Sequence, residues 1–459
     1  MQNFSFYRGS PAALLAAVAV FWLPCAAAQT AGGSGEATGA SAKPVVVTLD
    51  EAIRLAQTSD AGYAASAAAS RVAGLDRSIA LGSLLPSVVY NNSAIYTQGN
   101  GQVVGEPPGT TTPGTPRFIA NNGVHEYVSQ ASITETIGFS GVAGFRRAEA
   151  EAAKARAEAE IARRGLVVAV TGLFYSSLAA DQKLAVAERA HQEAVDFVRL
   201  TTEREQAREA AHADVVKAQL EEQQTARELS DARVEAEKAH LELGVLLFAD
   251  PRTPCTLSAP EAEPALASRE DVQAAAAKNN PELRSALAAL RSANAGLMST
   301  WAGLAPDLSA NYTYGIDAPQ FAVNGPDHLG NLGSSATVSL NIPIWDWFGS
   351  ENKVRQSRIL RNAAQVALTA AQRRLIAQLD ETYSEAVAAR DQLASLDLSV
   401  STAAESLGLV KLAYQGGEGT VLEVVDAQSA YVTAENARED GRVRFETALA
   451  ELETLTGTK

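Results

Sequence analysis

Apolar and polar residues alternate along residues 333–344, which is the pattern of a β-strand. The apolar positions in this run are Val338, Leu340, Ile342 and Ile344. Residues 308–316 alternate in the same way. Because successive side chains of a strand point to opposite faces, both runs predict strands with one apolar and one polar face. Two further strands are expected at 87–97 and 124–139, where the alternation is less regular.

Long helices are predicted where the chain lacks proline. All 17 prolines lie outside residues 117–250 and 344–459, and both runs are rich in Ala, Glu, Arg, Gln and Leu. Proline interrupts helices, whereas these residue types favour them. We expect two helices of about 65 residues, each on the order of 100 Å long, and two shorter helices that return antiparallel to them. The expected ranges are 141–205, 211–247, 346–413 and 420–456.

The chain contains a tandem duplication. The segment VTLDEAIRLAQTSDAGYAAS from Val47 is similar to ASREDVQAAAAKNNPELRSA from Ala267, and SLLPSVVYNNSAIY from Ser83 is similar to GLAPDLSANYTYGI from Gly303. Both pairs have one spacing, since 267 − 47 and 303 − 83 equal 220. Each repeat is expected to hold a short helix, a strand pair and two long helices. The expected repeats are residues 47–263 and 264–459.

The first 28 residues have the features of a secretory signal peptide. Arg8 precedes an apolar run at 12–23, and three alanines at 26–28 give the small-residue pattern at which such signals are cleaved. The run is too short for a membrane-spanning helix, which needs about 18 or more apolar residues. The mature chain is therefore expected to be exported and to begin near Gln29.

Residues 29–46 are rich in Gly and Ser and predict a flexible linker. Attachment of lipid at Cys25 is an open alternative, because Leu23-Pro24-Cys25 partly resembles a lipoprotein signal. If Cys25 is removed with the signal, Cys255 has no cysteine partner and no intrachain disulfide can form.

Composition narrows the possible functions. Alanine dominates the apolar residues and aromatic residues make up 6% of the chain, which suits closely packed long helices better than one thick core. The formal net charge of −15 argues against a nucleic-acid partner, which needs a basic surface. The histidines are not spaced as metal ligands, and no dinucleotide-binding loop is present. We therefore expect no metal, no cofactor and no enzymatic activity.

The number of strands predicts an assembly of several copies. After residue 28, no segment is long and apolar enough to cross a bilayer as a helix, so any insertion must use strands. Four strands cannot close a membrane barrel, since the smallest known barrels have about eight. Several chains must then associate, because unpaired strand edges are not tolerated in lipid.

Four segments together resemble the outer-membrane efflux (outer membrane factor, TolC-like) family. They are LLPSVVYNNSAIY and LAPDLSANYTYGI at the strand starts, LNIPIWDWFGSENKVRQSR at the strand-to-helix junction, and YQGGEGTVLEVVDAQSAYVTAE at the helix turn. The resemblance extends from about residue 47 to 456. It implies a mainly α homotrimer in which three chains of four strands form a 12-stranded membrane β-barrel, continued by a 12-helix periplasmic α-barrel.

The resemblance also implies location and partners. The barrel would lie among the lipids of the outer membrane of a Gram-negative bacterium, and the helices would extend into the periplasm. The expected partners are a periplasmic adaptor (membrane fusion) protein and an inner-membrane pump or transporter.

The helix turn at 414–428 is the candidate functional site. Its glycines are expected to end the outgoing helix in a left-handed conformation, and Thr420 to cap the returning helix. Glu423 and Asp426 are three residues apart and therefore share a helix face. By the resemblance they line a constriction at the periplasmic tip, where three copies would form a negative, cation-selective ring. The alternative is a solvated helix face. The glycines are Gly416, Gly417 and Gly419.

The corresponding turn of the first repeat lacks these glycines. In their places are Ala207, Arg208 and Ala210. Asp214 aligns with Glu423 in the duplication, and the resemblance suggests Asp214 as a partner of Tyr414 in a latch that holds the tip closed. An arginine of some family members is replaced by Gly419, so the latch is expected to be weaker here or built differently.

Three aromatic residues follow the last predicted strand. Trp345, Trp347 and Phe348 are either an aromatic belt at the periplasmic face of the membrane or packing at the junction between sheet and helix.

The resulting hypothesis is a passive outer-membrane exit channel of a tripartite efflux or type I secretion system, opened by docking at its tip. One alternative is an exported periplasmic coiled-coil adaptor or scaffold, which needs no amphipathic strands. Another is a diffusion porin, which needs no long helical hairpins. The sequence does not specify the exported substrate.

Overall fold

The computed structural model of the 459-residue chain describes residues 45–96, 125–258, 266–325 and 329–457. The expected signal peptide with Cys25, the linker up to residue 44 and the residues 97–124 between the first two expected strands lie outside these ranges. The chain divides into two units, and the following description concerns the second, Pro44–Lys459.

Each repeat contains a short helix, a second helix, two strands of a common sheet and two long helices. The first repeat has α1 (Leu49–Ser59), α2 (Ala61–Gly82), β2 (Ser87–Tyr96), β3 (His125–Ile137), α3 (Phe139–Gln206) and α4 (His212–Leu247). The second has α5 (Arg269–Asn279), α6 (Pro281–Ala302), β5 (Asp307–Ala318), β6 (Leu332–Asn341), α7 (Gly349–Gly416) and α8 (Val421–Thr456). The short strands β1 (Val45–Val47) and β4 (Cys255–Leu257) pair in parallel.

Equivalent helices of the two repeats have equal lengths. Both α3 and α7 have 68 residues, and both α4 and α8 have 36. The N-caps also correspond. Thr48 and Ser268 begin α1 and α5, and Asp60 and Asn280 begin α2 and α6, each accepting a hydrogen bond from a backbone N–H three residues further on. Since 268 − 48 and 280 − 60 both equal 220, the same positions of the duplication start the same helices.

Three features differ from the sequence-based expectation. Each repeat has a second helix, α2 or α6, where one short helix was expected, and β1 and β4 were not predicted. At the junction of sheet and helix, β6 ends at Asn341 before the expected 344, and α7 begins at Gly349 after the expected 346. Pro343 has no N–H to donate to a strand, and Trp347 and Phe348 have left-handed φ angles of 55° and 64° that neither a strand nor a helix accepts.

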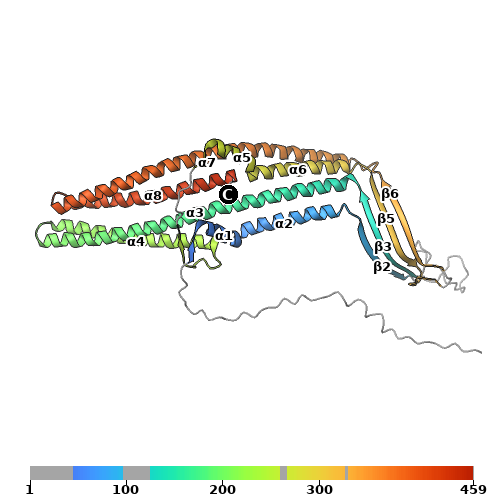
Figure 1. The fold of residues 1–459 in the computed structure, drawn as a ribbon, viewed down its shortest axis with the longest axis horizontal. Coiled ribbons are helices and arrows are strands. Elements are labelled where there is room, and N and C mark those ends of the chain that lie inside the picture. The colour runs from blue at the N-terminus through green and yellow to red at the C-terminus, as the bar shows by residue number, and fades with distance from the viewer. Residues whose placement is uncertain (1–44, 97–124, 259–265, 326–328, 458–459) are drawn as a thin grey trace, which may run out of the picture. The chain divides into compact units, whose positions relative to one another are not determined.

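Figure 1 shows the sheet at one end of the helices and the α3–α4 and α7–α8 turns at the other. The sheet is antiparallel with the strand order β2-β3-β5-β6, so β2 and β6 are its edges in the single chain. Helix α3 packs against α2 and α6 next to the sheet, and against α4 and α8 beyond them. Alanine is the most frequent residue at the buried helix positions, and its small side chain lets these helices approach closely.

One face of the sheet is mainly apolar and the other mainly polar, although Val89 and Ile95 of β2, where the alternation is less regular, lie on the more polar face. The register places large apolar side chains of all four strands on one face, and they are exposed in the single chain: Val88, Tyr90, Ile133, Ile137, Leu308, Tyr312, Tyr314, Val338 and Leu340. The opposite face includes Asn91, Thr134, Asn311, Thr313, Ser335 and Thr337. An exposed apolar surface of this extent indicates that something apolar covers it.

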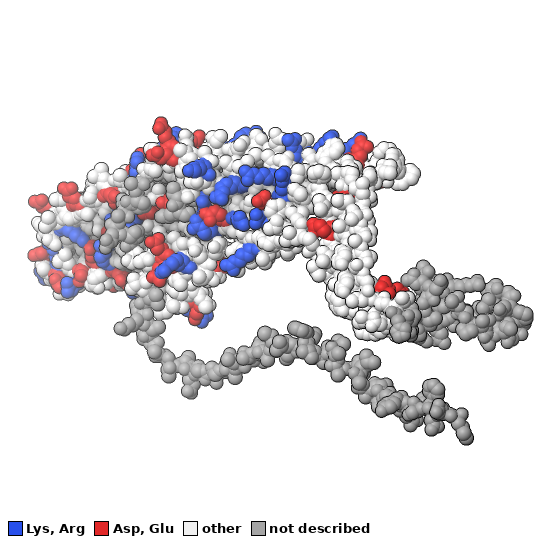
Figure 2. Space-filling model, turned by 45° about the vertical axis from the view of Figure 1, so that its right-hand side comes forward, with Lys and Arg blue, Asp and Glu red and all other residues white. Residues whose placement is uncertain are grey.

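Charge is distributed unevenly over the face seen in Figure 2. The sheet carries few charged side chains, Lys and Arg gather on the helices next to it, and Asp and Glu are frequent toward the opposite end. Within the described ranges, none of the helices is both long enough and apolar enough to cross a membrane.

Candidate functional site at the helical tip

The turn between α7 and α8 depends on two of its three glycines. Gly417 has a φ of 81°, a left-handed conformation that costs other residues about 1–2 kcal/mol. Gly419 donates a hydrogen bond to the carbonyl of Ala413 at 3.1 Å, and a Cβ at this position would lie 2.9 Å from the backbone nitrogen of Tyr414. By contrast, Gly416 has open space where a Cβ would stand.

Glu423 stabilises the start of α8. The hydroxyl of Thr420 accepts a hydrogen bond from the backbone N–H of Glu423 at 3.3 Å, and the carboxylate of Glu423 accepts one from the N–H of Thr420 at 2.7 Å. This reciprocal pair is a capping box. Asp426 is exposed, and its negative charge adds to the effect of burial and of Glu228 in raising the pKa of Glu221 on α4. Both Glu423 and Asp426 thus lie near the start of α8, at the tip. Their convergence in a trimer stays a prediction.

The turn between α3 and α4 is built without glycine. Arg208 takes the left-handed conformation, with a φ of 65°, and the N-cap residue Ala211 has no side chain that could accept a hydrogen bond. A contact of 2.8 Å between Nδ1 of His212 and Oε1 of Glu205 spans this turn. A side-chain contact thus spans the first turn in addition to its backbone hydrogen bonds, whereas glycines and a capping box shape the second.

Arg204, near the end of α3, joins the two helical hairpins. Its guanidinium donates hydrogen bonds to the carbonyl oxygens of Tyr414 at 2.7 Å and Gln415 at 2.6 Å, and lies 4.8 Å from the ring centre of Tyr414. These carbonyls end α7, where the helix dipole favours a positive charge. Arg204 was not predicted from the sequence, because no local pattern connects an arginine of one repeat with a helix end of the other.

Tyr414 is buried at this contact. Its ring centre lies 5.2 Å from that of Phe197, and Val421 and Val424 pack beside it. Burial raises the pKa of the Tyr414 phenol, although the charge of Arg204 opposes this effect. The phenol oxygen has no hydrogen bond of acceptable geometry within the described residues.

The expected latch partner Asp214 forms an ion pair of 4.0 Å with Lys217. No hydrogen bond joins Asp214 to Tyr414 in the single chain, since the phenol oxygen is without one among the described residues. Arg204 instead links the two hairpins here, through its hydrogen bonds to the carbonyls of α7. A latch function for Asp214 and Tyr414 stays a prediction.

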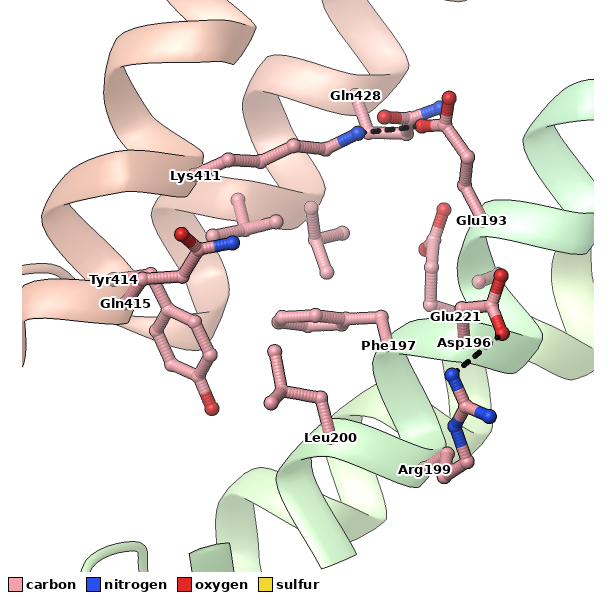
Figure 3. Close-up of a pocket in the computed structure, with 13 residues that line it drawn as sticks. Glu193, Asp196, Phe197, Arg199, Leu200, Glu221, Lys411, Tyr414, Gln415 and Gln428 are labelled. Carbon is pink, nitrogen blue, oxygen red and sulfur yellow. Dashed lines mark hydrogen bonds and ion pairs between the residues drawn. The ribbon is translucent and has the colours of Figure 1, made fainter. Parts of the chain in front are cut away.

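A cavity of about 360 Å³ lies between the hairpins at this end. In Figure 3, Phe197 and Leu200 of α3 face Tyr414 and Gln415 of α7 across it. The ion pair of Lys411 with Glu193, at 2.6 Å, connects α7 with α3 at its border.

The aromatic residues at the other end of α7 form a cluster. The ring centre of Trp345 lies 5.9 Å from that of Trp347 and 5.2 Å from that of Phe348. All three side chains are exposed, Trp347 by 82%, so they pack against one another more than against the helices. Asp346 accepts a hydrogen bond from the N–H of Ser350 at 2.6 Å and thereby supports the start of α7. The placement of Trp345, Trp347 and Phe348 at a membrane surface stays a prediction.

One group of titratable residues lies away from the tip. Nε2 of His240 is 2.8 Å from Asp181, and this hydrogen bond raises the pKa of His240. Sγ of Cys255 lies 4.0 Å from Nδ1 of the same ring, but burial raises the pKa of this thiol, which disfavours the reactive thiolate. Within the described ranges, no three or more His, Cys, Asp and Glu side chains are arranged to hold a metal ion.

Comparison with known proteins supports the resemblance found in the sequence. Residues 265–458 match the model of the outer membrane efflux protein family. The fold is similar to the Campylobacter jejuni CmeC outer membrane channel, at 14% identity and a TM-score of 0.74, over 89% of this chain and 85% of that chain. It is also similar to the outer membrane protein VceC from Vibrio cholerae, at 16% identity and a TM-score of 0.72, over 89% of this chain and 96% of that chain.

A further similar structure is the open state of the Neisseria gonorrhoeae MtrE outer membrane channel. The identity is 17% and the TM-score 0.69, over 89% of this chain and 88% of that chain. A search of curated proteins finds no match. The resemblance to the outer-membrane efflux family is confirmed, and the matched family and structures, described as efflux proteins and membrane channels, agree with the expectation that the chain is not an enzyme.

Proposed function

We propose that this chain, which has the fold of outer membrane efflux channels and matches their family over its second half, is the passive outer-membrane exit channel of a tripartite efflux or type I secretion system. The observation that carries the proposal is the combination of an open sheet with an exposed apolar face and long helical hairpins in one chain. An exported coiled-coil scaffold would have no use for such a sheet face. A diffusion porin would have no use for helices of 68 residues.

The active form in this proposal is a homotrimer. Edge strands β2 and β6 need partners in lipid, where an unpaired backbone N–H or C=O costs several kcal/mol. Three copies of the four-stranded sheet give 3 × 4 = 12 strands, enough for a closed barrel. The apolar face would contact outer-membrane lipid, with Trp345, Trp347 and Phe348 at its periplasmic boundary.

The tip would be the gate of this channel. Because Arg204 ties the end of α3 to the end of α7, separation of the hairpins must break its hydrogen bonds. We propose that docking of a periplasmic adaptor and an inner-membrane pump supplies the free energy for this separation. In the closed trimer, Glu423 and Asp426 of three chains would surround the opening and attract cations.

The proposal is tested on the full mature protein, purified in detergent and reconstituted in planar bilayers. We expect a trimer by native mass spectrometry and a narrow, cation-selective resting conductance. The double variant Glu423→Gln with Asp426→Asn should conduct with reduced cation selectivity. A stable monomer with its full strand content would contradict the trimer, and unchanged selectivity would place the two carboxylates away from the pore.

A further inference from the structure

The cavity between the two hairpins has the size and walls of a ligand site. At about 360 Å³ it falls in the range of small-molecule pockets, which is about 300–1,000 Å³. Its apolar wall comes from both hairpins and consists of Ala194, Phe197, Leu200, Val424 and Val425.

The charges around the cavity leave one carboxylate unbalanced. Of the three acidic residues that line it, Glu193 pairs with Lys411 at 2.6 Å and Asp196 pairs with Arg199 at 3.3 Å. Glu221 of α4 has no ion pair among the described residues. Burial, and after it the negative charges of Glu228 and Asp426, raise the pKa of Glu221. A bound cation would compensate the negative charge of Glu221.

Gln428 of α8 supplies a second, independent polar group. Its side chain lines the cavity and is 9% exposed, and its Oε1 is buried without a hydrogen-bond partner among the described residues. A buried acceptor without a partner costs about 1–3 kcal/mol, which a ligand N–H would recover. Figure 3 shows Gln428 at the border of the cavity near the Lys411–Glu193 pair.

We propose that this cavity binds a small organic cation with an aromatic or branched apolar body and an ammonium head. The body packs on Phe197 and Leu200, while the head takes the charge of Glu221 and donates a hydrogen bond to Oε1 of Gln428. Neutral compounds leave Glu221 uncompensated, and anions are repelled by it.

Such a ligand would hold the hairpins together. It contacts α3 and α4 on one side and α7 and α8 on the other, so it binds best when the two sides are close. If the tip is the gate, the ligand keeps the channel closed. This consequence rests on the proposed function. Binding itself does not depend on that assumption.

The test uses the full mature protein in lipid nanodiscs and phenylpropylammonium as the probe, with uncharged phenylpropanol as its matched analogue. Saturation-transfer NMR should show the cation binding with a Kd on the order of 0.1–1 mM, as expected for a ligand of this size. Phenylpropanol should bind at least about tenfold more weakly. Empty nanodiscs give the background from partition into lipid.

Variants test separately how the charge of Glu221, the hydrogen bond to Gln428 and the volume of the cavity contribute to binding. Glu221→Gln and Gln428→Leu should each weaken binding about three- to tenfold, since each removes one favourable interaction. Val425→Trp should abolish binding by filling the cavity. Glu237→Gln, an exposed carboxylate of the same helix α4 that does not line the cavity, is the control and should bind as the unchanged protein does. Circular dichroism checks that every variant is folded.

Equal binding of the cation and the alcohol would overturn the proposal, as would unchanged binding by folded Glu221→Gln and Gln428→Leu. The probe should also slow hydrogen exchange at the α7–α8 turn, and absence of this effect would refute the bridging of the hairpins. A protein that binds the probe as described but shows no channel conductance would retain the site and lose the proposed function.

Discussion

The two helix turns of this chain occupy equivalent places in the duplication, yet they are stabilised differently. In the second repeat, Gly417 supplies the left-handed residue and Thr420 and Glu423 cap the next helix. In the first, Arg208 adopts the left-handed conformation and Ala211 caps nothing. The flanking helices nevertheless have identical lengths. What both repeats retain is the left-handed residue that reverses the chain, and the residue type that supplies it can vary.

The difference also assigns distinct roles to the turns. The start of α8 after the second turn is capped locally, by the reciprocal hydrogen bonds of Thr420 and Glu423. The first turn is locally poorer, but Arg204 just before it reaches across to α7. We therefore expect substitutions in the second turn to act on its own folding, and substitution of Arg204 to act on the contact between hairpins.

The largest effect is expected for Arg204→Gln. This change removes two charge-assisted hydrogen bonds and the contact with the Tyr414 ring, so local opening of the tip should become easier by about 2–4 kcal/mol. Hydrogen exchange at the end of α7 should accelerate at least about tenfold. Arg208→Gln is the control, because it removes the same charge near the tip without any contact to Tyr414 or Gln415. Equal acceleration in both variants would mean that net charge matters and the specific contact does not.

An intermediate effect is expected for Gly419→Ala. The new Cβ would lie 2.9 Å from the nitrogen of Tyr414, and relieving such a clash costs about 1–3 kcal/mol. The measurement is thermal unfolding together with exchange at the α7–α8 turn. Gly416→Ala introduces the same methyl group into open space, and should be neutral or stabilising by up to about 1 kcal/mol. If both substitutions destabilise the turn alike, its geometry is not set by the close approach at Gly419.

The smallest effects are expected for a reciprocal pair of cap substitutions. Thr420→Ala removes the second-repeat cap and should destabilise the start of α8 by about 1 kcal/mol. Ala211→Thr introduces a cap in the first repeat and should stabilise the start of α4 by a similar or smaller amount. Exchange rates of the first-turn amides of both helices report the two changes. Effects of the same sign would show that the turns do not differ in capping.

The strands and long helices could be predicted from patterns along the sequence, whereas contacts between distant segments could not. The strands were visible because each exposes one apolar face, and the long helices because proline is absent from them. Helix α2 starts at Ala61, separated from the end of α1 by Asp60 alone, and the short side chain of this cap residue marks the boundary. The pair β1 and β4 joins short segments more than 200 residues apart, since 255 − 45 equals 210, and such pairing leaves no local trace.

The tip was predicted in part. The three glycines and the cap at Thr420 follow from local conformational preferences, although only Gly417 and Gly419 prove to be required by the turn. The capping role of Glu423 was also available from the sequence, because a threonine followed three residues later by glutamate is its signature. Arg204 was not, since its partners are main-chain carbonyls, which every residue possesses.

Because α3 and α7 have equal lengths, as do α4 and α8, the two repeats set the same distance between the sheet and the tip. Each hairpin runs from the sheet or the middle of the unit to the tip, so its length fixes how far the tip stands from the sheet. Shortening one hairpin alone would shift its turn along the helix axis relative to the turn of the other hairpin. Arg204 would then no longer reach the carbonyls of α7. A change of reach must therefore occur in both repeats at once, in steps of about seven residues that preserve the packing faces. We therefore expect insertions and deletions in the long helices to be tolerated only in matched pairs, one in each repeat.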